Sequence, residues 1–159
     1  MNILALDLGT KCGWADSKGY NGVWHLKPST HESAGERYRK FGMLLREEMS
    51  IHQISFVAYE EVHRHIGTEA AHVYGGLMAI LQCICCERGI GYKGVGVGTI
   101  KKHATGKGSA SKEEMVASAI KKFKTVNVID HNHADSLHLL DYAQNVIFSH
   151  PQNELGLMP

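Results

Sequence analysis

Short apolar runs and stretches of alternating polarity along the chain predict five β-strands. Continuous apolar runs are typical of strands that are buried on both faces of a sheet, whereas alternation with glycine and polar residues is typical of an antiparallel meander. The first and fourth strands are of the continuous kind, and the second and third are of the alternating kind. The expected strands cover residues 3–6, 13–16, 22–26, 54–59 and 92–97.

Apolar residues at helical spacing predict four helices between and after these strands. Ser33 with Glu36, and Ser111 with Glu114, have the spacing of a capping box, so each pair is expected to begin a helix. Gly89 is expected to end the second helix, which is apolar over much of its circumference and therefore needs more than one packing partner. The expected helices cover residues 33–49, 69–88, 111–123 and 135–147.

The composition fits one globular domain. The chain has 159 residues, of which 43% are hydrophobic and 21% are charged, as is ordinary for a soluble protein. We expect a single domain over residues 1–148 and a frayed tail over 149–159. No stretch approaches the roughly 20 apolar residues of a membrane span, and the first residues do not resemble a signal peptide. We therefore expect a cytoplasmic protein with no membrane partner.

Lysines are concentrated in one third of the chain, although the formal net charge is only +1. Such an uneven distribution favours a polyanionic partner. Some of these lysines fall within residues 99–108, a basic and glycine-rich segment that we assign to no helix. The clustered residues are Lys93, Lys101, Lys102, Lys107, Lys112, Lys121, Lys122 and Lys124.

The four cysteines do not have the spacing of a metal or disulfide site. Three of them fall within the second expected helix, and Cys12 lies far from them in the sequence. No second Cys-x-x-Cys or histidine pair completes a zinc site at the usual spacing. We interpret the cysteines as small buried hydrophobes in a reduced compartment.

Three acidic residues stand where a sheet would bring them together. Asp7 ends the first strand and Glu60 follows the fourth, and ligand sites gather at strand ends in sheets with helical crossovers. Glu60 is preferred over Glu61 because side chains alternate along a strand. Asp135 lies in the first turn of the last expected helix. We therefore interpret Asp7, Glu60 and Asp135 as one site.

Clustered carboxylates repel one another unless a cation lies among them, and Mg²⁺ binds through a few carboxylates, water and substrate phosphate. Two such ions about 3.5–4 Å apart can activate a water molecule and stabilise the leaving oxygen of a phosphodiester. Metal-assisted phosphodiester hydrolysis is therefore the natural hypothesis. The alternatives are that Asp7 caps the turn that begins at Leu8 and that the glutamates are solvated turn residues.

Four segments, in this order, resemble the successive motifs of RuvC-type Holliday-junction resolvases, which belong to the ribonuclease H-like superfamily. The resemblance extends from residue 3 to about residue 147, and the compact chain is most similar to the phage or prophage branch. The segments are Ala-Leu-Asp-Leu-Gly-Thr-Lys-Cys-Gly-Trp-Ala (5–15), Val-Ala-Tyr-Glu-Glu-Val (57–62), Gly-Thr-Ile-Lys-Lys through Gly-Ser-Ala-Ser-Lys (98–112) and His-Ala-Asp-Ser-Leu-His-Leu-Leu (133–140).

The resemblance implies an α/β fold, with a five-stranded mixed sheet flanked by helices, and a homodimer joined through the helix at 69–88. It also implies an endonuclease that uses Mg²⁺ or Mn²⁺, with two ions per site, to nick two opposed strands of a four-way DNA junction. The catalytic residues that it implies are Asp7, Glu60 and Asp135, with Lys101 and Lys112 near the scissile phosphate.

The chain departs from this pattern at Asn132, where the bacterial members of the family carry Asp or His. Asparagine can still offer an oxygen atom to Mg²⁺, but without a charge it should bind the ion more weakly. His131, His133 and Asp130 are therefore alternatives for the fourth metal ligand.

Two further classes of protein fit parts of the sequence. Residues 7–13 also resemble the first phosphate-binding loop of actin-like and sugar-kinase ATPases, but those enzymes close two such domains over ATP and this chain has the length of one. A YqgF-like protein acting on RNA, or a junction-binding protein that has lost cleavage, is the other alternative. The presence of all three carboxylates argues for cleavage.

Overall fold

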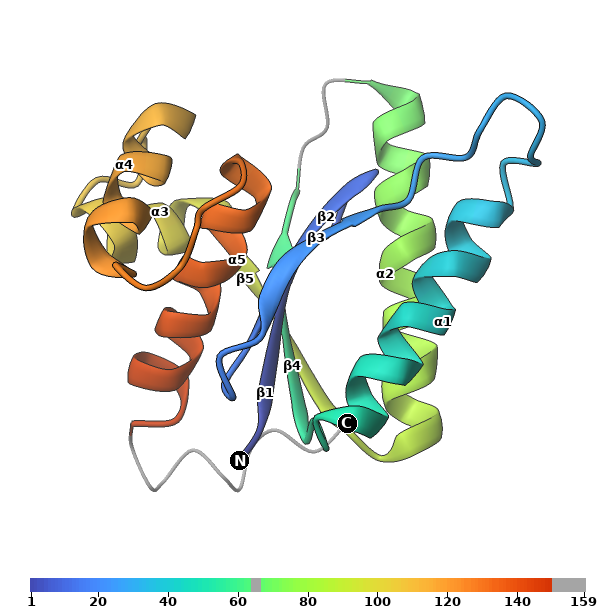
Figure 1. The fold of residues 1–159 in the computed structure, drawn as a ribbon, viewed down its shortest axis with the longest axis horizontal. Coiled ribbons are helices and arrows are strands. Elements are labelled where there is room, and N and C mark those ends of the chain that lie inside the picture. The colour runs from blue at the N-terminus through green and yellow to red at the C-terminus, as the bar shows by residue number, and fades with distance from the viewer. Residues whose placement is uncertain (64–66, 150–159) are drawn as a thin grey trace.

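Five strands form one mixed sheet in the order β3-β2-β1-β4-β5 (Figure 1). The computed structural model describes residues 1–63 and 67–149. Strands β1, β2 and β3 form the antiparallel meander, whereas β4 and β5 run parallel to β1. The five expected strands are confirmed, with bounds shifted by a few residues. They are β1 (Ile3–Asp7), β2 (Lys11–Asp16), β3 (Asn21–His25), β4 (Phe56–Glu61) and β5 (Gly91–Gly96).

Helices cover both faces of the sheet. Figure 1 shows α1 and α2 packed on one face, and α3, α4 and α5 gathered on the other. The last helix continues from α5 into a short π-helical turn, η1. The described helices are α1 (Glu36–Ile51), α2 (Thr68–Arg88), α3 (Val97–Thr105), α4 (Lys112–Lys122), α5 (His131–Tyr142) and η1 (Ala143–Ile147).

Alternation along β1 divides the core into two clusters. Leu4 and Leu6 pack with α1 and α2, whereas Ile3 and Ala5 pack with residues of α3, α4 and α5. Because side chains alternate between the faces of a strand, Asp7 continues the row of Ile3 and Ala5 and faces the α5 side. The alternation of side-chain direction along β1 is therefore enough to place the carboxylate of Asp7 on the face that α5 covers.

Helix boundaries show where the sequence prediction holds and where it is wrong. The capping box of Ser111 and Glu114 is present at the start of α4. Helix α1 instead begins after Gly35, with no side-chain cap, so the expected capping box of Ser33 and Glu36 is wrong. Segment 99–108 was assigned to no helix, but most of it belongs to α3. The expected tail lies, apart from residue 149, outside the described residues.

Helix α2 is buried along one face and exposed along another. Leu77 and Leu81 are fully buried in the core, and the αL conformation of Gly89 ends the helix as expected. By length and composition alone, α2 is apolar enough to cross a membrane, which corrects the expectation that no segment approaches such a span. Cys83 and Cys86 are exposed on this helix, so the prediction that all four cysteines are buried is also wrong.

Candidate active site

Asp7 and Glu60 lie side by side on two neighbouring parallel strands. Leu6 of β1 is paired with Tyr59 of β4, so the two acidic residues follow at the same level, on strands about 4.8 Å apart. Glu60 continues the row of Phe56 and Ala58, which pack on the α5 side. Both carboxylates therefore project from the same face at the same end of the sheet, and Glu61 projects from the opposite face.

Asp135 is brought to this point by a close contact between α5 and β2. Gly13 is the β2 partner of Asp7, and a Cβ atom on Gly13 would lie only 1.9 Å from the backbone oxygen of Asn132. Only glycine can therefore occupy position 13 while the first turn of α5 rests on the sheet. Asp130 caps that turn by accepting a hydrogen bond from the backbone N–H of His133 (3.0 Å).

Burial raises the pKa values of the three carboxyl groups, and repulsion by neighbouring carboxylates adds to it. Burial, and then the charges of Glu60 and Asp135, hold the pKa of Asp7 well above its ordinary value. Burial and the charge of Asp135 raise the pKa of Glu60 to about 7. Burial raises the pKa of Asp135 to about 6, although Lys101 and Lys112 act to lower it. These effects show that the three groups share one electrostatic environment.

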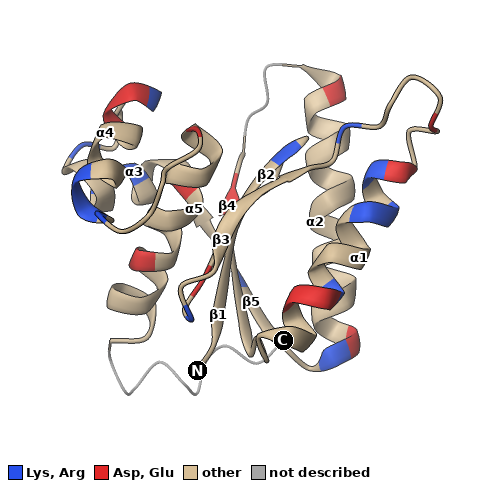
Figure 2. Cartoon of the chain, in the orientation of Figure 1, with Lys and Arg blue, Asp and Glu red and all other residues tan. Residues whose placement is uncertain are grey.

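Two lysines reach this environment from α3 and α4. The Lys101 ammonium group donates a hydrogen bond to the backbone oxygen of Ala110 (2.7 Å), which fixes the side chain between the two helices. Lys112 is the first residue of α4, and its Nζ lies 3.2 Å from Nε2 of His131 at the start of α5. Figure 2 shows basic positions on α3 and α4 near acidic positions on α5 and the end of β4.

Buried polar contacts fix α3 and α4 against α5. The Asp141 carboxylate of α5 accepts hydrogen bonds from His103 of α3 and Lys122 of α4. His138 is fully buried, and its Nε2 lies 3.2 Å from the backbone oxygen of Met115 in α4. Because buried polar groups are costly to leave unpaired, these contacts hold the three helices, and the lysines that they carry, in one arrangement.

The surroundings differ among the four candidates for the fourth metal ligand, which are Asp130, His131, Asn132 and His133. His133 is 1% exposed, and its ring nitrogens contact the Asn21 side-chain oxygen (3.0 Å) and the Ile129 backbone N–H (3.2 Å). Its ring is therefore held inside the fold. Asp130 caps α5 and also accepts from the Asn132 amide (3.3 Å), while His131 contacts Lys112 as described above.

The residues of this cluster fit a hard divalent cation. Asp7, Glu60 and Asp135, with the amide oxygen of Asn132, form the all-oxygen donor set that Mg²⁺ and Mn²⁺ prefer. A divalent cation would also stabilise the charged forms of these carboxylates, which burial and repulsion disfavour. Among the described residues, however, the carboxylate oxygens of these three acids do not all lie within 4.8 Å of one another.

The group whose ligand atoms do lie within 4.8 Å of one another is a different one. Asp16, Glu48 and His52 are buried together and could hold a metal ion. Sequence reasoning missed this group. The i, i+4 spacing of Glu48 and His52 was the available signal, since it places both side chains on one face of α1.

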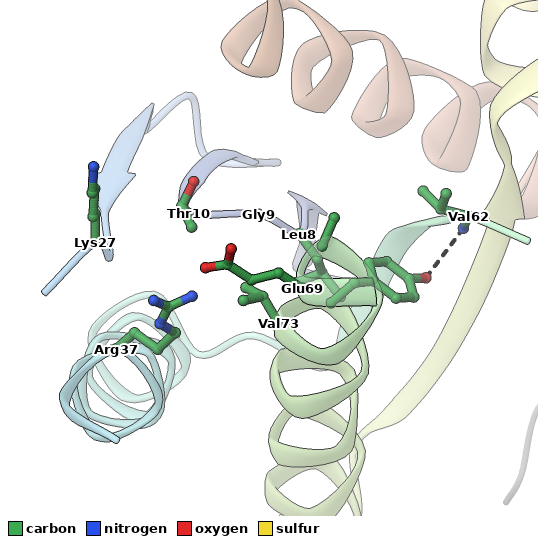
Figure 3. Close-up of a pocket in the computed structure, with 10 residues that line it drawn as sticks. Leu8, Gly9, Thr10, Lys27, Arg37, Val62, Glu69 and Val73 are labelled. Atoms are coloured by element: carbon green, nitrogen blue, oxygen red, sulfur yellow. Dashed lines mark hydrogen bonds between the residues drawn. The ribbon is translucent and has the colours of Figure 1, made fainter. Parts of the chain in front are cut away.

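A cavity of about 500 Å³ opens on the other side of the turn that follows Asp7. Figure 3 shows Thr10, Lys27, Arg37 and Glu69 around it, on β1–β2, β3–α1, α1 and α2, with the Glu69 carboxylate and the Arg37 guanidinium pointing toward one another. Tyr74 also lines the cavity and donates a hydrogen bond to the backbone oxygen of Glu60 (3.0 Å). The cavity wall is therefore connected directly to the strand that carries Glu60.

Comparison with solved structures identifies the architecture. The chain is similar to Thermus thermophilus RuvC in complex with a Holliday junction substrate (TM-score 0.75, 23% identity, 88% of this chain and 90% of that chain). A second structure of Thermus thermophilus RuvC is similar over 91% of this chain and 96% of that chain (TM-score 0.73, 23% identity). The yeast mitochondrial Holliday junction resolvase Ydc2 matches over 87% and 75% (TM-score 0.59, 13% identity).

The fold is ribonuclease H-like. The expected five-stranded mixed sheet flanked by helices is therefore confirmed, and the chain shares this architecture with known junction resolvases. No family model matches the sequence, and no curated protein matches it. At these identities the similarity concerns the fold, so the chemistry has to be argued from the side chains.

Proposed function

We propose that this chain is a metal-dependent, structure-selective endonuclease that resolves four-way or branched DNA junctions by paired hydrolysis of phosphodiester bonds. The resemblance of the sequence motifs to the phage or prophage branch of the resolvases supports this proposal. So does the similarity of the fold to a RuvC that was solved with a Holliday junction substrate. We place its action in the cytoplasm, or in the host cytoplasm if a phage encodes it.

One observation carries the proposal. Asp7, Glu60 and Asp135 come from two strands and a helix that are far apart in the sequence, yet the charges of Glu60 and Asp135 both raise the pKa of Asp7, and that of Asp135 raises the pKa of Glu60. A structural role would favour pairing each carboxylate with its own cation, because buried unpaired charges are costly. A shared anionic site beside two lysines is instead the arrangement that metal-assisted phosphoryl chemistry needs.

The side chains have separate tasks in this proposal. Asp7, Glu60, Asp135 and Asn132 would hold Mg²⁺ or Mn²⁺, and two bound ions would supply an activated water and stabilisation of the leaving oxygen. Lys101 and Lys112 contact the scissile phosphate and the adjoining backbone, and offset the charge that develops on them. The contacts of α3 and α4 with α5 keep both ammonium groups in place before DNA binds.

A substrate panel tests the reaction. A labelled four-way junction, a flap, a linear duplex and an RNA–DNA hybrid are each incubated with the wild-type chain and Mg²⁺, Mn²⁺ or EDTA. We expect symmetric nicks in the junction with either ion and no cleavage with EDTA. Cleavage of the RNA–DNA hybrid alone would favour the RNA-acting alternative. Binding of the junction without any cleavage in Mg²⁺ or Mn²⁺ would contradict the proposal.

We also propose that two copies associate through the exposed face of α2. Gly75 has nothing within 4 Å of the place of a Cβ atom, and Ala79 is exposed one turn farther along. Gly76 instead packs against Tyr38 of α1, and Leu77 is fully buried, so neither is available for a partner. An isologous dimer through Gly75 and Ala79 would present two sites related by the two-fold symmetry of a junction.

The variant Ala79→Arg tests this association. We expect a folded monomer in sedimentation experiments. This monomer should still nick one strand of a junction but should lose paired cutting within one junction lifetime. Met43→Arg, an exposed position on α1, is the matched control and should remain dimeric. Leu77→Asp should instead unfold the chain, because it buries a charge in the core. A wild-type chain that sediments as a monomer both free and on DNA would contradict the dimer.

A further inference from the structure

We propose that Asp16, Glu48 and His52 bind a divalent transition-metal ion, with Zn²⁺ as the preferred occupant, and that this ion ties the end of β2 to the end of α1. The site would be structural. It does not depend on the proposed nuclease function, because it lies at the other end and on the other face of the sheet.

The position of the group separates it from the candidate active site. Asp16 is paired with Leu4 near the start of β1, three residues before Asp7, which corresponds to about 10 Å along a strand. Its side chain continues the row of Cys12 and Trp14, which face α1 and α2. The carboxylates of the candidate active site face α5 instead.

Three ligand atoms converge between β2 and α1. One ligand atom from each of Asp16, Glu48 and His52 lies within 4.8 Å of those of the other two residues, and Nδ1 of His52 lies 2.8 Å from Oδ2 of Asp16. Ligands of a Zn²⁺ ion at about 2.0–2.1 Å are separated from one another by roughly 3–3.5 Å. The donor atoms are therefore close to the spacing of a coordination sphere, and rotation of the side chains would bring them around one ion.

The same atoms are buried without hydrogen bonds among the described residues. The side chain of Asp16 is 0% exposed, and its Oδ1 accepts from the backbone N–H groups of Lys18 (3.0 Å) and Tyr20 (2.8 Å). Its Oδ2 has no hydrogen-bond partner, and neither has Oε1 of Glu48 or Nδ1 of His52. Oδ2 and Nδ1 are thus close together but not aligned as donor and acceptor. Buried polar atoms of this kind require an explanation, and a shared cation supplies one.

The donor set favours a transition metal over Mg²⁺. Two carboxylates and one imidazole combine oxygen with nitrogen ligands, and imidazole suits Zn²⁺ rather than Mg²⁺. A divalent ion would neutralise both carboxylates, which otherwise have one imidazole between them. The ring of His52 is held by surrounding contacts: Tyr20 packs edge-on at 4.2 Å between centroids, and the Asn2 amide donates to the His52 backbone oxygen (3.1 Å). Such outer contacts orient a metal-binding histidine.

Calorimetry and thermal unfolding with Zn²⁺ test the site. The full chain is stripped with EDTA, dialysed and titrated with ZnCl₂ or, separately, MgCl₂. We expect one Zn²⁺ per chain. We also expect Tm to rise by about 5–10 °C when free Zn²⁺ is 100 times its Kd, with no comparable rise in Mg²⁺. Glu48→Gln and His52→Gln should each weaken Zn²⁺ binding by about 100-fold or more.

Matched variants separate this site from other metal-binding groups. Glu47→Gln and His72→Gln change exposed residues of the same types and should bind Zn²⁺ like the wild type. Asp7→Asn should also keep the Zn²⁺ ion, which distinguishes this proposal from a failure of the proposed nuclease site. Zn²⁺ binding that survives in both Glu48→Gln and His52→Gln, or that is lost in Asp7→Asn, would overturn the proposal. Absence of binding to the wild type would show an ion-paired triad only and would also overturn it.

Discussion

Two groups of acidic residues lie at opposite ends of the same sheet, and their surroundings differ. Asp7, Glu60 and Asp135 retain some exposure and have two lysines beside them, whereas Asp16 is completely enclosed. Lys101 contacts the Ala110 oxygen and Lys112 contacts the His131 ring, so neither forms a direct ion pair with these carboxylates. Their positive charge can therefore attract a phosphate to the first group. In the second group the basic partner of the carboxylates, among the described residues, is the imidazole of His52. Carboxylates alone therefore do not define a catalytic site; the access and the flanking charge do.

The two groups also differ in how their elements are joined. The first group depends on the contact of α5 with β2 at Gly13, so a small shift of one helix would disperse it. The second group joins the last turn of α1 to a strand end that is already fixed by its pairing with β1. We therefore expect substitutions in the first group to alter catalysis and substitutions in the second group to alter stability. The following experiments test this contrast.

Removal of one charge from each group should give the largest difference. Asp7→Asn and Glu60→Gln preserve side-chain shape but remove a metal ligand, so junction cleavage should fall by about 10³-fold or more while junction binding survives. Glu48→Gln removes the same charge from the other group and should leave the cleavage rate unchanged at a temperature where the variant is folded. Single-turnover cleavage measures both. Equal rates for Glu60→Gln and the wild type would refute the site assignment.

A methyl group at position 13 should affect only the first group. Gly13→Ala places a Cβ atom against the backbone of Asn132, so α5 must move away from β2 and carry Asp135 with it. Misplacement of this kind is expected to reduce cleavage by about 100-fold. Gly67→Ala, which also meets open space and lies outside the proposed dimer face, is the control. Zn²⁺ binding by the Gly13→Ala chain should persist, and its loss would show that the two groups are not separable.

The pH dependence of stability without metal should reveal the repulsion within the first group. The pKa of Glu60 is about 7 in the folded chain, above its ordinary value of 4.5, so the folded state binds a proton more tightly than the unfolded state. Stability from this residue is therefore greatest at low pH and is lost as pH rises through 7. Relative to the wild type, Glu60→Gln should gain about 3 kcal/mol between pH 4.5 and 8. Denaturant unfolding measures this difference, and Mg²⁺ should reduce it.

Substitution of the lysines should have the smallest effect on cleavage. Lys101→Ala and Lys112→Ala are each expected to lower the cleavage rate by about tenfold and to reduce the slope of log Kd against log salt by about one unit. Lys121→Ala, in the last turn of α4, is the control for a lysine outside the site. If the rates and slopes of all three variants match the wild type, the lysines of α3 and α4 are only a solvated face.

Local pattern was sufficient for the framework of the first site. Two short continuous apolar runs predicted strands, and the two-residue repeat of a strand placed Asp7 and Glu60 on one face and Glu61 on the other. The capping box of Ser111 and Glu114 predicted where α4 begins, because its hydrogen bonds are made within four residues. Such features depend on neighbours in the chain, so the sequence contains all of the information that they need.

Other features were decided by contacts between distant segments. Helix α3 was missed because Gly98 lies within it and Gly96 and Gly106 flank it, yet burial of Ile100 against the sheet stabilises a helix here. Helix α2 is apolar on several sides, so its composition did not distinguish the buried Leu77 from the open face at Gly75.

The burial of Asp16 with Glu48 and His52 was also decided by contacts between distant segments. The sequence determined by itself the strands, most helices and the faces of the strand-end carboxylates, since these follow from periods of two and 3.6 residues. Which acids meet, and which of them are closed off from water, was decided only by the tertiary structure. The physical reason is that burial and repulsion act through space, between segments such as those of Asp7 and Glu60 or of Asp16 and Glu48, which are more than 30 positions apart in the chain.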